Sequence, residues 1–215
     1  MLKVSQKRIS VSKSVTVSAF QPSRLALCLS TQGLFLPGPG LGDHCIPIAS
    51  FYLTWKAREY DHHTRFIELA GEINCNMPKH IIGKLAQTLS CRKKKALHGA
   101  KILVAGIAYK KNVDDMRESP SLVLMELLKE RGVDFDYYDP YIPIVQPTRE
   151  HAAFTGMKSV NWSAESIGQY DAVLIATDHD DVDWKLLVES ADLIVDTRNA
   201  LKDFASNYDE KIVKA

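Results

Sequence analysis

Short apolar runs alternate with helical patterns across the second half of the chain. The apolar runs that are typical of buried strands occupy residues 101–105, 133–138, 171–176 and 193–195. Between the first two, Ser119 and Pro120 have the residue types of a helix N-cap and first helical position, and Gly132 ends that helix. Strands that alternate with helices are joined by crossovers, so this pattern predicts a doubly wound, mainly parallel α/β sheet.

An apolar stripe with spacings of three and four runs through residues 50–92. Its members are Phe66, Ala70, Ile73, Met77, Ile81, Leu85 and Leu89. This spacing predicts one long amphipathic helix, in which Pro78 introduces a kink or opens the second half. Because the sequence offers the stripe no partner helix, we expect it to pack against another domain or a second subunit. An ordinary core-facing helix would show the same pattern. The predicted fold is a long helical segment followed by a Rossmann-like sheet.

The first part of the chain differs in composition from the rest. Residues 1–33 are rich in serine, basic, and without a sustained hydrophobic period. No acidic residue occurs before Asp43, whereas the rest of the chain carries 22 basic and 26 acidic residues. This composition is typical of a transit peptide, a disordered tail or translated sequence unrelated to the fold. We therefore expect a leader over 1–33, a loop with central helices over 34–97, and a C-terminal α/β domain over 98–215.

Charge and cysteine spacing exclude several classes of partner. The net charge is +1, which gives no reason to expect nucleic acid or an anionic membrane as partner. No apolar run approaches the roughly 18 residues of a membrane span. The cysteines show no C-x-x-C spacing, so neither zinc nor a disulfide framework is predicted, and reduced thiols in a cytoplasmic protein are expected.

An acidic segment, residues 177–184, invites a metal interpretation. It reads TDHDDVDW, with four aspartates and one histidine. The glycine expected at the sixth position of an EF-hand loop is missing, and Asp180 or Asp181 is better used to cap a helix that contains Trp184 and Leu187. We therefore predict no metal site.

The sharpest candidate for chemistry is a Gly/Pro loop that ends in a cysteine. Residues 37–48 read PGPGLGDHCIPI. Its glycines allow the backbone to approach a bound ligand, and the loop then presents Cys45 before Ile46 and Pro47, which we expect not to start a helix at once. A thiolate is a good nucleophile near neutral pH, although a lone cysteine is more often an inert packed thiol.

Two further segments place cations at strand ends. Residues 106–120 read GIAYKKNVDDMRESP, which is not a G-x-G-x-x-G fingerprint. Lys110 and Arg117 flank a loop that ends at a helix N-terminus, a suitable place for phosphate groups, although Arg117 could instead pair with Asp114 or Glu118. Arg198 follows the last predicted strand, where either Asp196 or a ligand phosphate could be its partner.

These motifs together resemble the UDP-glucose/GDP-mannose dehydrogenase family, nearest to its UDP-N-acetylglucosamine 6-dehydrogenase branch. The resemblance begins near Gly33 and covers the cysteine loop, the G-x-A-[FY]-K pattern and the D-x-R-E-S-P pattern. It implies that Cys45 is the nucleophile of an NAD-dependent oxidation of a nucleotide sugar at C6. It also implies that Arg117 reaches the NAD held by another domain. By the same resemblance the substrate is contacted by Gly40, Leu41, Gly42, Tyr109, Lys110 and Arg198.

The chain departs from this family at two positions and in the length of sequence before the cysteine loop. The family usually has glycine where this chain has Asp43, and an aspartate where it has Ala49, four residues after the cysteine. In the family a whole dinucleotide-binding domain precedes the loop, and we expect that domain to be missing here. We therefore expect a cytoplasmic C-terminal fragment that binds a UDP-sugar, takes part in polysaccharide biosynthesis, associates through its central helix and is inactive alone. A non-catalytic UDP-sugar-binding or oligomerisation module is the alternative.

Overall fold

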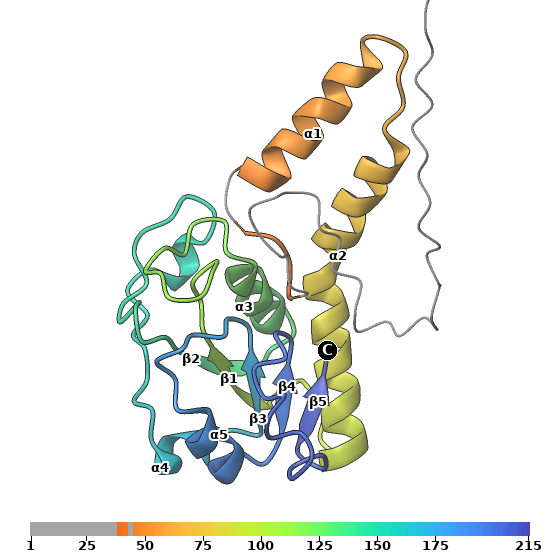
Figure 1. The fold of residues 1–215 in the computed structure, drawn as a ribbon. Coiled ribbons are helices and arrows are strands. Elements are labelled where there is room, and N and C mark those ends of the chain that lie inside the picture. Colours follow the sequence, from red (N-terminus) through yellow and green to blue (C-terminus); the bar gives the residue numbers. More distant parts are fainter. Residues whose placement is uncertain (1–37, 43–44) are drawn as a thin grey trace, which may run out of the picture. The chain divides into compact units, whose positions relative to one another are not determined.

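The computed structural model describes residues 38–42 and 45–215, without the side chains of residues 45–47. The expected leader, residues 1–33, and Asp43 therefore lie outside the described residues. The described part contains a five-stranded parallel sheet in the order β2-β1-β3-β4-β5 (Figure 1). The strands are β1 (Lys101–Ala105), β2 (Asp134–Tyr138), β3 (Ala172–Ile175), β4 (Ile194–Asp196) and β5 (Ile212–Lys214).

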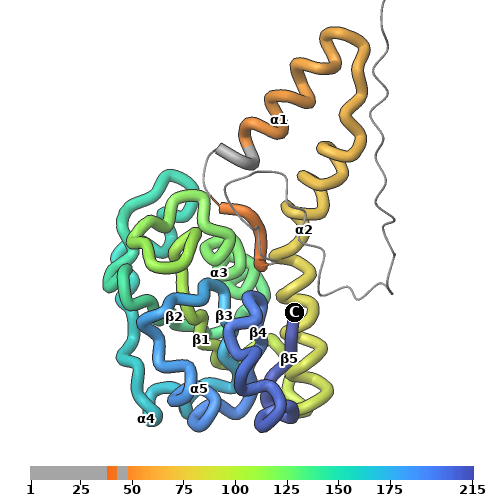
Figure 2. Tube along the Cα trace, viewed as in Figure 1, coloured from red at the N-terminus to blue at the C-terminus, as the bar shows by residue number. Residues whose placement is uncertain are grey.

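The predicted doubly wound α/β sheet is confirmed, and four of its strands lie where the apolar runs predicted them. The helix predicted after Ser119 is α3 (Pro120–Glu130), and the Ser119 side chain accepts a hydrogen bond from the backbone N–H of Ser121. The sequence did not predict β5. This three-residue strand pairs with β4 at the edge of the sheet, and Figure 2 shows that it lies next to the C-terminus. Too few alternating residues mark it as a strand.

Both faces of the sheet are covered because its strands are apolar on both sides. On one face, Ile102 and Val104 of β1 join a core that includes residues of α3 and of α2 (Arg65–Thr88). On the other, Leu103 and Ala105 join residues of α4 (Ala164–Ile167) and α5 (Trp184–Ser190). Alternate residues of a strand point to opposite faces, so one strand contributes to both cores.

Residues 50–92 are largely helical as predicted, but they form two helices and not one continuous helix. The first, α1, runs from Cys45 to Arg58, and α2 follows after residues 59–64, with a π-helical turn, η2 (Leu89–Lys93), at its end. Asp61 has a φ of 57°, which helical backbone does not allow. The break lets α1 fold back on α2, where the Thr64 hydroxyl donates to the Thr54 hydroxyl over 3.0 Å.

The expectation that Ile46 and Pro47 would delay the helix is also wrong. Helix α1 begins at Cys45, so Pro47 lies in its first turn. The backbone N–H groups of a first turn have no acceptor within the helix, and a proline there removes no hydrogen bond. Pro78 lies inside α2 and does not end it.

The apolar stripe of α2 has two different environments. Ile81, Leu85 and Leu89 are fully buried in the core that α2 shares with α3 and the sheet. Phe66 is 89% exposed and Ile73 is 55% exposed. The expectation that the stripe has no partner in this chain is therefore wrong for its second half, which packs against α3. None of the described helices combines the length and apolar character that a membrane crossing needs.

Candidate functional site

Three loops meet at the carboxyl ends of the parallel strands and form the candidate site. In the order 2-1-3-4-5 the crossovers after β1 and β3 leave in opposite directions, and open α/β sheets usually bind their ligands at such a switch point. The loop after β1 carries Lys110, the loop after β3 carries Asp178, and Arg198 follows β4. The parallel sheet therefore places cations that are far apart in the sequence at the same edge.

The glycine loop, residues 38–42, lies against these strand ends. The backbone N–H of Leu41 donates to Asn74 Oδ1 of α2 over 2.8 Å. A Cβ on Gly42 would lie 2.6 Å from the Cβ of Tyr109, and one on Gly38 would overlap Nη1 of Arg198. A Cβ on Gly40 would lie 3.1 Å from Pro120, at the start of α3. The structure thus gathers Gly40, Leu41, Gly42, Tyr109 and Arg198, which the sequence analysis selected together.

Gly42→Ala is expected to displace this loop, because the Cβ of Tyr109 belongs to a short, rigid part of its side chain. Overpacking of this kind costs about 1–3 kcal/mol of stability. We expect the backbone amide of Leu41 to exchange its hydrogen faster in the variant, measured by hydrogen exchange with NMR or mass spectrometry. Gly83→Ala is the matched control, since no atom lies within 4 Å of the added Cβ. Equal exchange of Leu41 in both variants would contradict the close contact.

Arg198 is a largely buried cation at the end of β4. Its Nε–H donates to the backbone carbonyl of Ala176 over 2.8 Å. Burial lowers the pKa of the guanidinium, and the nearby Asp178 carboxylate opposes this shift. Burial in turn raises the pKa of Asp178, against the charges of Arg198 and Lys111. A guanidinium stays protonated at neutral pH despite such a shift, so a positive charge is held at this strand end.

The Arg198 guanidinium does not pair with the Asp196 carboxylate, as the sequence had suggested it could. The Asp196 carboxylate instead accepts backbone N–H groups, from Arg198 and Ala200 on Oδ1 and from Leu201 on Oδ2. It therefore shapes the turn after β4 and leaves the guanidinium to other partners. Within residues 38–42 and 45–215, no carboxylate forms an ion pair with Arg198.

The two lysines of the loop after β1 have different surroundings. Lys111 forms an ion pair with Asp180, with 2.9 Å between Nζ and Oδ1, and its hydrogen bond to Asp180 raises its pKa. Lys110 is exposed, and within the described part of the chain its side chain forms no ion pair or hydrogen bond. Of these two neighbouring cations, Lys110 is the one available to a ligand.

Arg117 pairs with a different carboxylate from the two that the sequence suggested. Its Nη2 lies 2.6 Å from Oδ2 of Asp115, and its Nε lies 3.0 Å from Oδ1. Pairing with Asp114 or Glu118 is therefore wrong. The backbone N–H of Arg117 also donates to Asp115, so the turn itself brings these two side chains together. The guanidinium is still 71% exposed.

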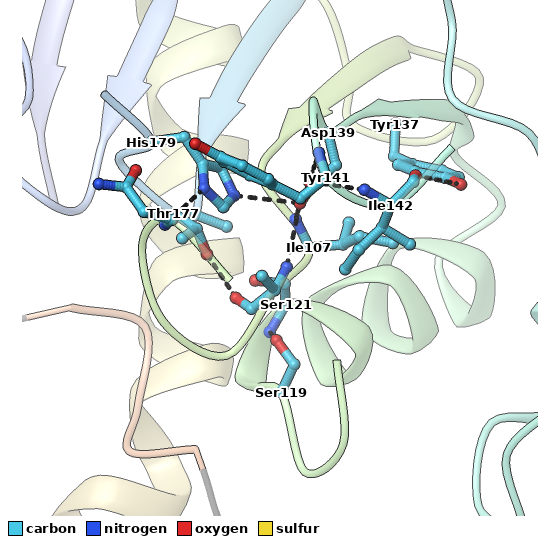
Figure 3. Close-up of polar contacts among 12 residues, drawn as sticks. Ile107, Ser119, Ser121, Tyr137, Asp139, Tyr141, Ile142, Thr177 and His179 are labelled. Carbon is cyan, nitrogen blue, oxygen red and sulfur yellow. Dashed lines mark hydrogen bonds and ion pairs between the residues drawn. The ribbon is translucent and has the colours of Figure 1, made fainter. Parts of the chain in front are cut away.

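A buried aspartate and histidine, which sequence reasoning did not select, connect the loops of the site (Figure 3). Asp139 follows β2, and its Oδ2 accepts the backbone N–H groups of Ile107 and Ala108 at 2.7 and 3.1 Å. The same oxygen lies 3.1 Å from Nε2 of the fully buried His179. Burial pushes the pKa of Asp139 upward, but the hydrogen bonds that it accepts from His179 and from the backbone lower it overall. The sequence signal that could have selected Asp139 was an Asp-Pro pair directly after an apolar strand.

The acidic segment around His179 serves other purposes than metal binding. Asp183, not Asp180 or Asp181, caps α5, because its Oδ1 accepts the backbone N–H of Leu186 over 3.0 Å. Asp181 accepts a hydrogen bond from the Tyr141 hydroxyl. Among the residues that the structure describes, no group of three or more His, Cys, Asp or Glu side chains could hold a metal ion.

Cys45 opens α1, and its side chain lies outside the described part of the structure. Ala49, which stands where the resembling family has aspartate, lies four residues later on the same helix and is exposed. Residues four apart on a helix share one face, so this position is a neighbour of Cys45. The structure thus explains how a side chain at position 49 could affect the cysteine.

The described residues do not fit the pyrophosphate of NAD. A dinucleotide loop needs open backbone after the first strand, so that the phosphates can approach it. Here a Cβ on Gly106 would lie 2.5 Å from the carbonyl oxygen of Thr177, so that position is already filled. The Thr177 hydroxyl also donates to the carbonyl of Ala108 over 2.7 Å. Side chains and backbone of the chain itself therefore occupy this turn.

A doubly wound sheet with cations gathered at the carboxyl ends of its strands has the architecture of a nucleotide-binding α/β domain. Sequence profiles of the UDP-glucose/GDP-mannose dehydrogenase family match this chain twice. The UDP binding domain matches residues 103–203, and the central domain matches residues 25–76. The chain therefore belongs to the UDP-glucose/GDP-mannose dehydrogenase family, of which it represents a C-terminal region.

Curated relatives carry the names of nucleotide-sugar dehydrogenases. UDP-N-acetyl-D-mannosamine dehydrogenase of Methanococcus maripaludis is 32% identical over 174 residues, which are 77% of this chain and 36% of that protein. UDP-N-acetyl-D-glucosamine 6-dehydrogenase of Pseudomonas aeruginosa is 28% identical over 151 residues, 69% of this chain and 34% of that protein. The chain thus spans about a third of the length of these relatives.

Solved structures agree with this assignment. UDP-D-ManNAc dehydrogenase from Pyrococcus horikoshii superposes with a TM-score of 0.63 at 28% identity, over 82% of this chain and 39% of that one. NDP-N-acetyl-D-galactosaminuronic acid dehydrogenase from Methanosarcina mazei Go1 gives a TM-score of 0.65 at 23% identity, over 87% of this chain and 41% of that one. At that identity the second likeness shows the fold alone.

Proposed function

We propose that this chain binds the diphosphate of a UDP-sugar at the carboxyl ends of β1 and β4, as the C-terminal part of an NAD-dependent nucleotide-sugar 6-dehydrogenase. The observation that carries the proposal is Arg198. Its guanidinium is largely buried under Gly38, and the nearby Asp178 carboxylate, like the other carboxylates of the described residues, forms no ion pair with it. A buried cation is costly unless an anion compensates it, and a phosphate has the charge and the acceptor oxygens to do so.

The surroundings of Arg198 suit the rest of the ligand. Lys110 and the ring of Tyr109 stand on the neighbouring loop, and the backbone of Gly40, Leu41 and Gly42 lies between that loop and α2. Lys110 provides a second charge for the diphosphate, and the glycine loop provides backbone N–H groups close to the sugar. The relatives named for UDP-N-acetyl-D-mannosamine and UDP-N-acetyl-D-glucosamine support an N-acetylated hexose as the sugar.

We propose Cys45 as the nucleophile of the oxidation. Its thiolate would add to the C6 aldehyde of the sugar to give a thiohemiacetal, which would become a thioester by losing a hydride to NAD bound outside the described residues. Water would then hydrolyse the thioester to the carboxylate and the free thiol. Its position as the first residue of α1 supports this role, because the free N–H groups of a helix N-terminus favour a thiolate. For Arg117, whose guanidinium is exposed beside Asp115, we propose contact with an NAD molecule that is bound outside the described residues.

The binding proposal predicts a specific pattern of affinities for UDP, measured by calorimetry with the full chain. Lys110→Ala and Arg198→Ala should each weaken binding roughly ten- to a hundredfold, the effect of losing one charge-assisted hydrogen bond of about 1.5–3 kcal/mol. Lys111→Ala is the matched control, since Lys111 already pairs with Asp180. Cys45→Ser should leave the affinity for UDP nearly unchanged, because the thiol acts on the sugar and not on the nucleotide.

Two results would overturn the proposed site. Unchanged UDP affinity in both Lys110→Ala and Arg198→Ala would show that the nucleotide binds elsewhere. An equal loss in Lys111→Ala and Lys110→Ala would show that only the general positive charge of the loop matters. Repeating the titration with UDP-N-acetyl-D-glucosamine separates the sugar contacts from the nucleotide contacts.

We also propose that the chain associates with a second copy through the α1–α2 hairpin. This hairpin carries several exposed large apolar side chains, namely Phe51, Tyr52, Trp55, Phe66 and Leu69. Exposed apolar side chains mark interaction sites when they form one patch. Sedimentation equilibrium should show a dimer, and Trp55→Glu with Phe66→Glu should shift it toward monomer. A wild-type chain that stays monomeric at high concentration would contradict the proposal.

A further inference from the structure

The fully buried His179 connects two loops of the site and takes no part in the binding proposed above. Its Nδ1 lies 2.9 Å from the backbone nitrogen of Asn112, and its Nε2 lies 3.1 Å from Oδ2 of Asp139. A backbone N–H can only donate, so Nδ1 must be the acceptor and carry no proton. The proton of the neutral ring is then on Nε2, where it is donated to Asp139. Asp139 therefore determines which ring nitrogen is available to Asn112.

The loop that carries Lys110 is held at both ends by this pair. At its start, the backbone N–H groups of Ile107 and Ala108 donate to Asp139. At its end, the backbone N–H of Asn112 donates to His179. Lys110 lies between these anchors in the sequence, and Figure 3 shows Asp139 and His179 next to each other, connected by a dashed line.

Other contacts of the loop end are exposed to solvent. The Asn112 carboxamide exchanges hydrogen bonds with Asp180, through Nδ2 to Oδ2 and from the Asp180 backbone N–H to Oδ1. Exposed polar contacts of this kind add little stability. The ring of His179 is fully buried and packs against Tyr141 with a centroid distance of 5.1 Å, so its bond to the exposed Asn112 is partly buried. Water competes less with a partly buried hydrogen bond than with an exposed one, so this bond is the stronger constraint on where the loop lies.

We propose that His179 is a positioning residue for the nucleotide site: through its Nδ1 it holds the loop in the conformation that presents Lys110 to the diphosphate. This inference rests on the proposed UDP site. Holding the loop before the ligand arrives removes the entropic cost of ordering it on binding. His179 does not touch the ligand, and its effect passes through the loop and Lys110.

Two variants separate the two hydrogen bonds of the ring. His179→Asn keeps an acceptor, Oδ1, near the position of Nδ1, and loses the donor to Asp139. His179→Gln keeps a donor that can reach Asp139, and loses the acceptor for Asn112. Both lose the ring, so their stabilities should fall alike. We expect His179→Gln to weaken UDP binding about tenfold and His179→Asn to stay within about threefold of the wild type, measured by calorimetry.

A double variant tests whether the effect passes through Lys110. If it does, Lys110→Ala combined with His179→Gln should bind UDP no more weakly than Lys110→Ala alone, because the group that His179 positions is already gone. Additive losses, or equal losses in the Gln and Asn variants, would show that His179 supports only the fold and would overturn the proposal. A wild-type chain that does not bind UDP would overturn the proposed function, and this inference with it.

A measurement on the wild-type chain covers the case in which the variants fail to fold. Since UDP and His179 favour the same loop conformation, saturating UDP should slow hydrogen exchange of the Asn112 amide at least about threefold. The amide of Ile102 in the centre of β1 is the reference for global stability. Binding of UDP with unchanged exchange at Asn112, relative to Ile102, would overturn the proposal.

Discussion

Asp139→Ala is expected to lower the free energy of unfolding by about 3–5 kcal/mol, the range for removing one partner of a buried charged network. The carboxylate is buried, and its removal leaves several donors without an acceptor. These donors are the backbone N–H groups of Ile107, Ala108, Tyr141 and Ile142 and the ring of His179. Urea unfolding monitored by circular dichroism at pH 7 measures the loss.

The effect of Asp139 should depend on pH in a definite direction. The pKa of this carboxyl is lowered in the folded chain, so its charged form stabilises the fold above the unfolded pKa of about 3.9. This contribution is lost as the pH falls through the folded pKa. The difference in stability between wild type and Asp139→Ala should therefore be full at pH 7 and shrink as the pH falls below about 4.

Asp192→Ala is the matched control for this prediction. Asp192 pairs with Lys93 at 2.7 Å, but its side chain is mostly exposed, so the variant should lose at most about 1 kcal/mol. A loss as small in Asp139→Ala as in Asp192→Ala would contradict the role of Asp139 as the shared acceptor of three loops.

Leu85→Ala in α2 is expected to cost about 2–5 kcal/mol, the usual range for emptying a fully buried leucine site. Leu85 is completely buried in the core shared by α2, α3 and the sheet. Leu69→Ala makes the same chemical change on the same helix, where the side chain is 51% exposed, and should change the stability by about 0.5 kcal/mol or less. Urea unfolding of both variants gives the comparison.

Equal effects of these two substitutions would contradict the division of α2 into a buried and an exposed half. A large loss in Leu69→Ala with little loss in Leu85→Ala would show that the helix packs through its first half. A concentration-dependent loss in Leu69→Ala alone would instead indicate that this half is covered by a second copy of the chain.

Local patterns in the sequence were sufficient to predict four strands of the sheet and the start of α3. A run such as 101–105 predicts a strand because a parallel strand is apolar on both faces, and Ser119 with Pro120 predicts a helix start because both residue types suit a first turn. These preferences belong to the residues themselves. They do not depend on which other segment is nearby.

The division of the central helix was decided by tertiary contacts. A spacing of three and four is the same whether the helix continues or turns back, so the pattern could not show the break at 59–64. Nor could it show that Leu85 meets α3 while Phe66 stays exposed. Burial depends on what packs against a helix face, and the periodicity reports only that a face exists.

The partners within the site were also decided by the tertiary structure. The sequence by itself predicted Lys110 and Arg198 as residues that bind phosphate, since both follow apolar strands. It could not determine that Arg117 pairs with Asp115, that Asp196 holds backbone N–H groups, or that His179 joins Asn112 to Asp139. Such pairings depend on which strand ends become neighbours, and only the order of the strands in the sheet brings residues 112, 139 and 179 together.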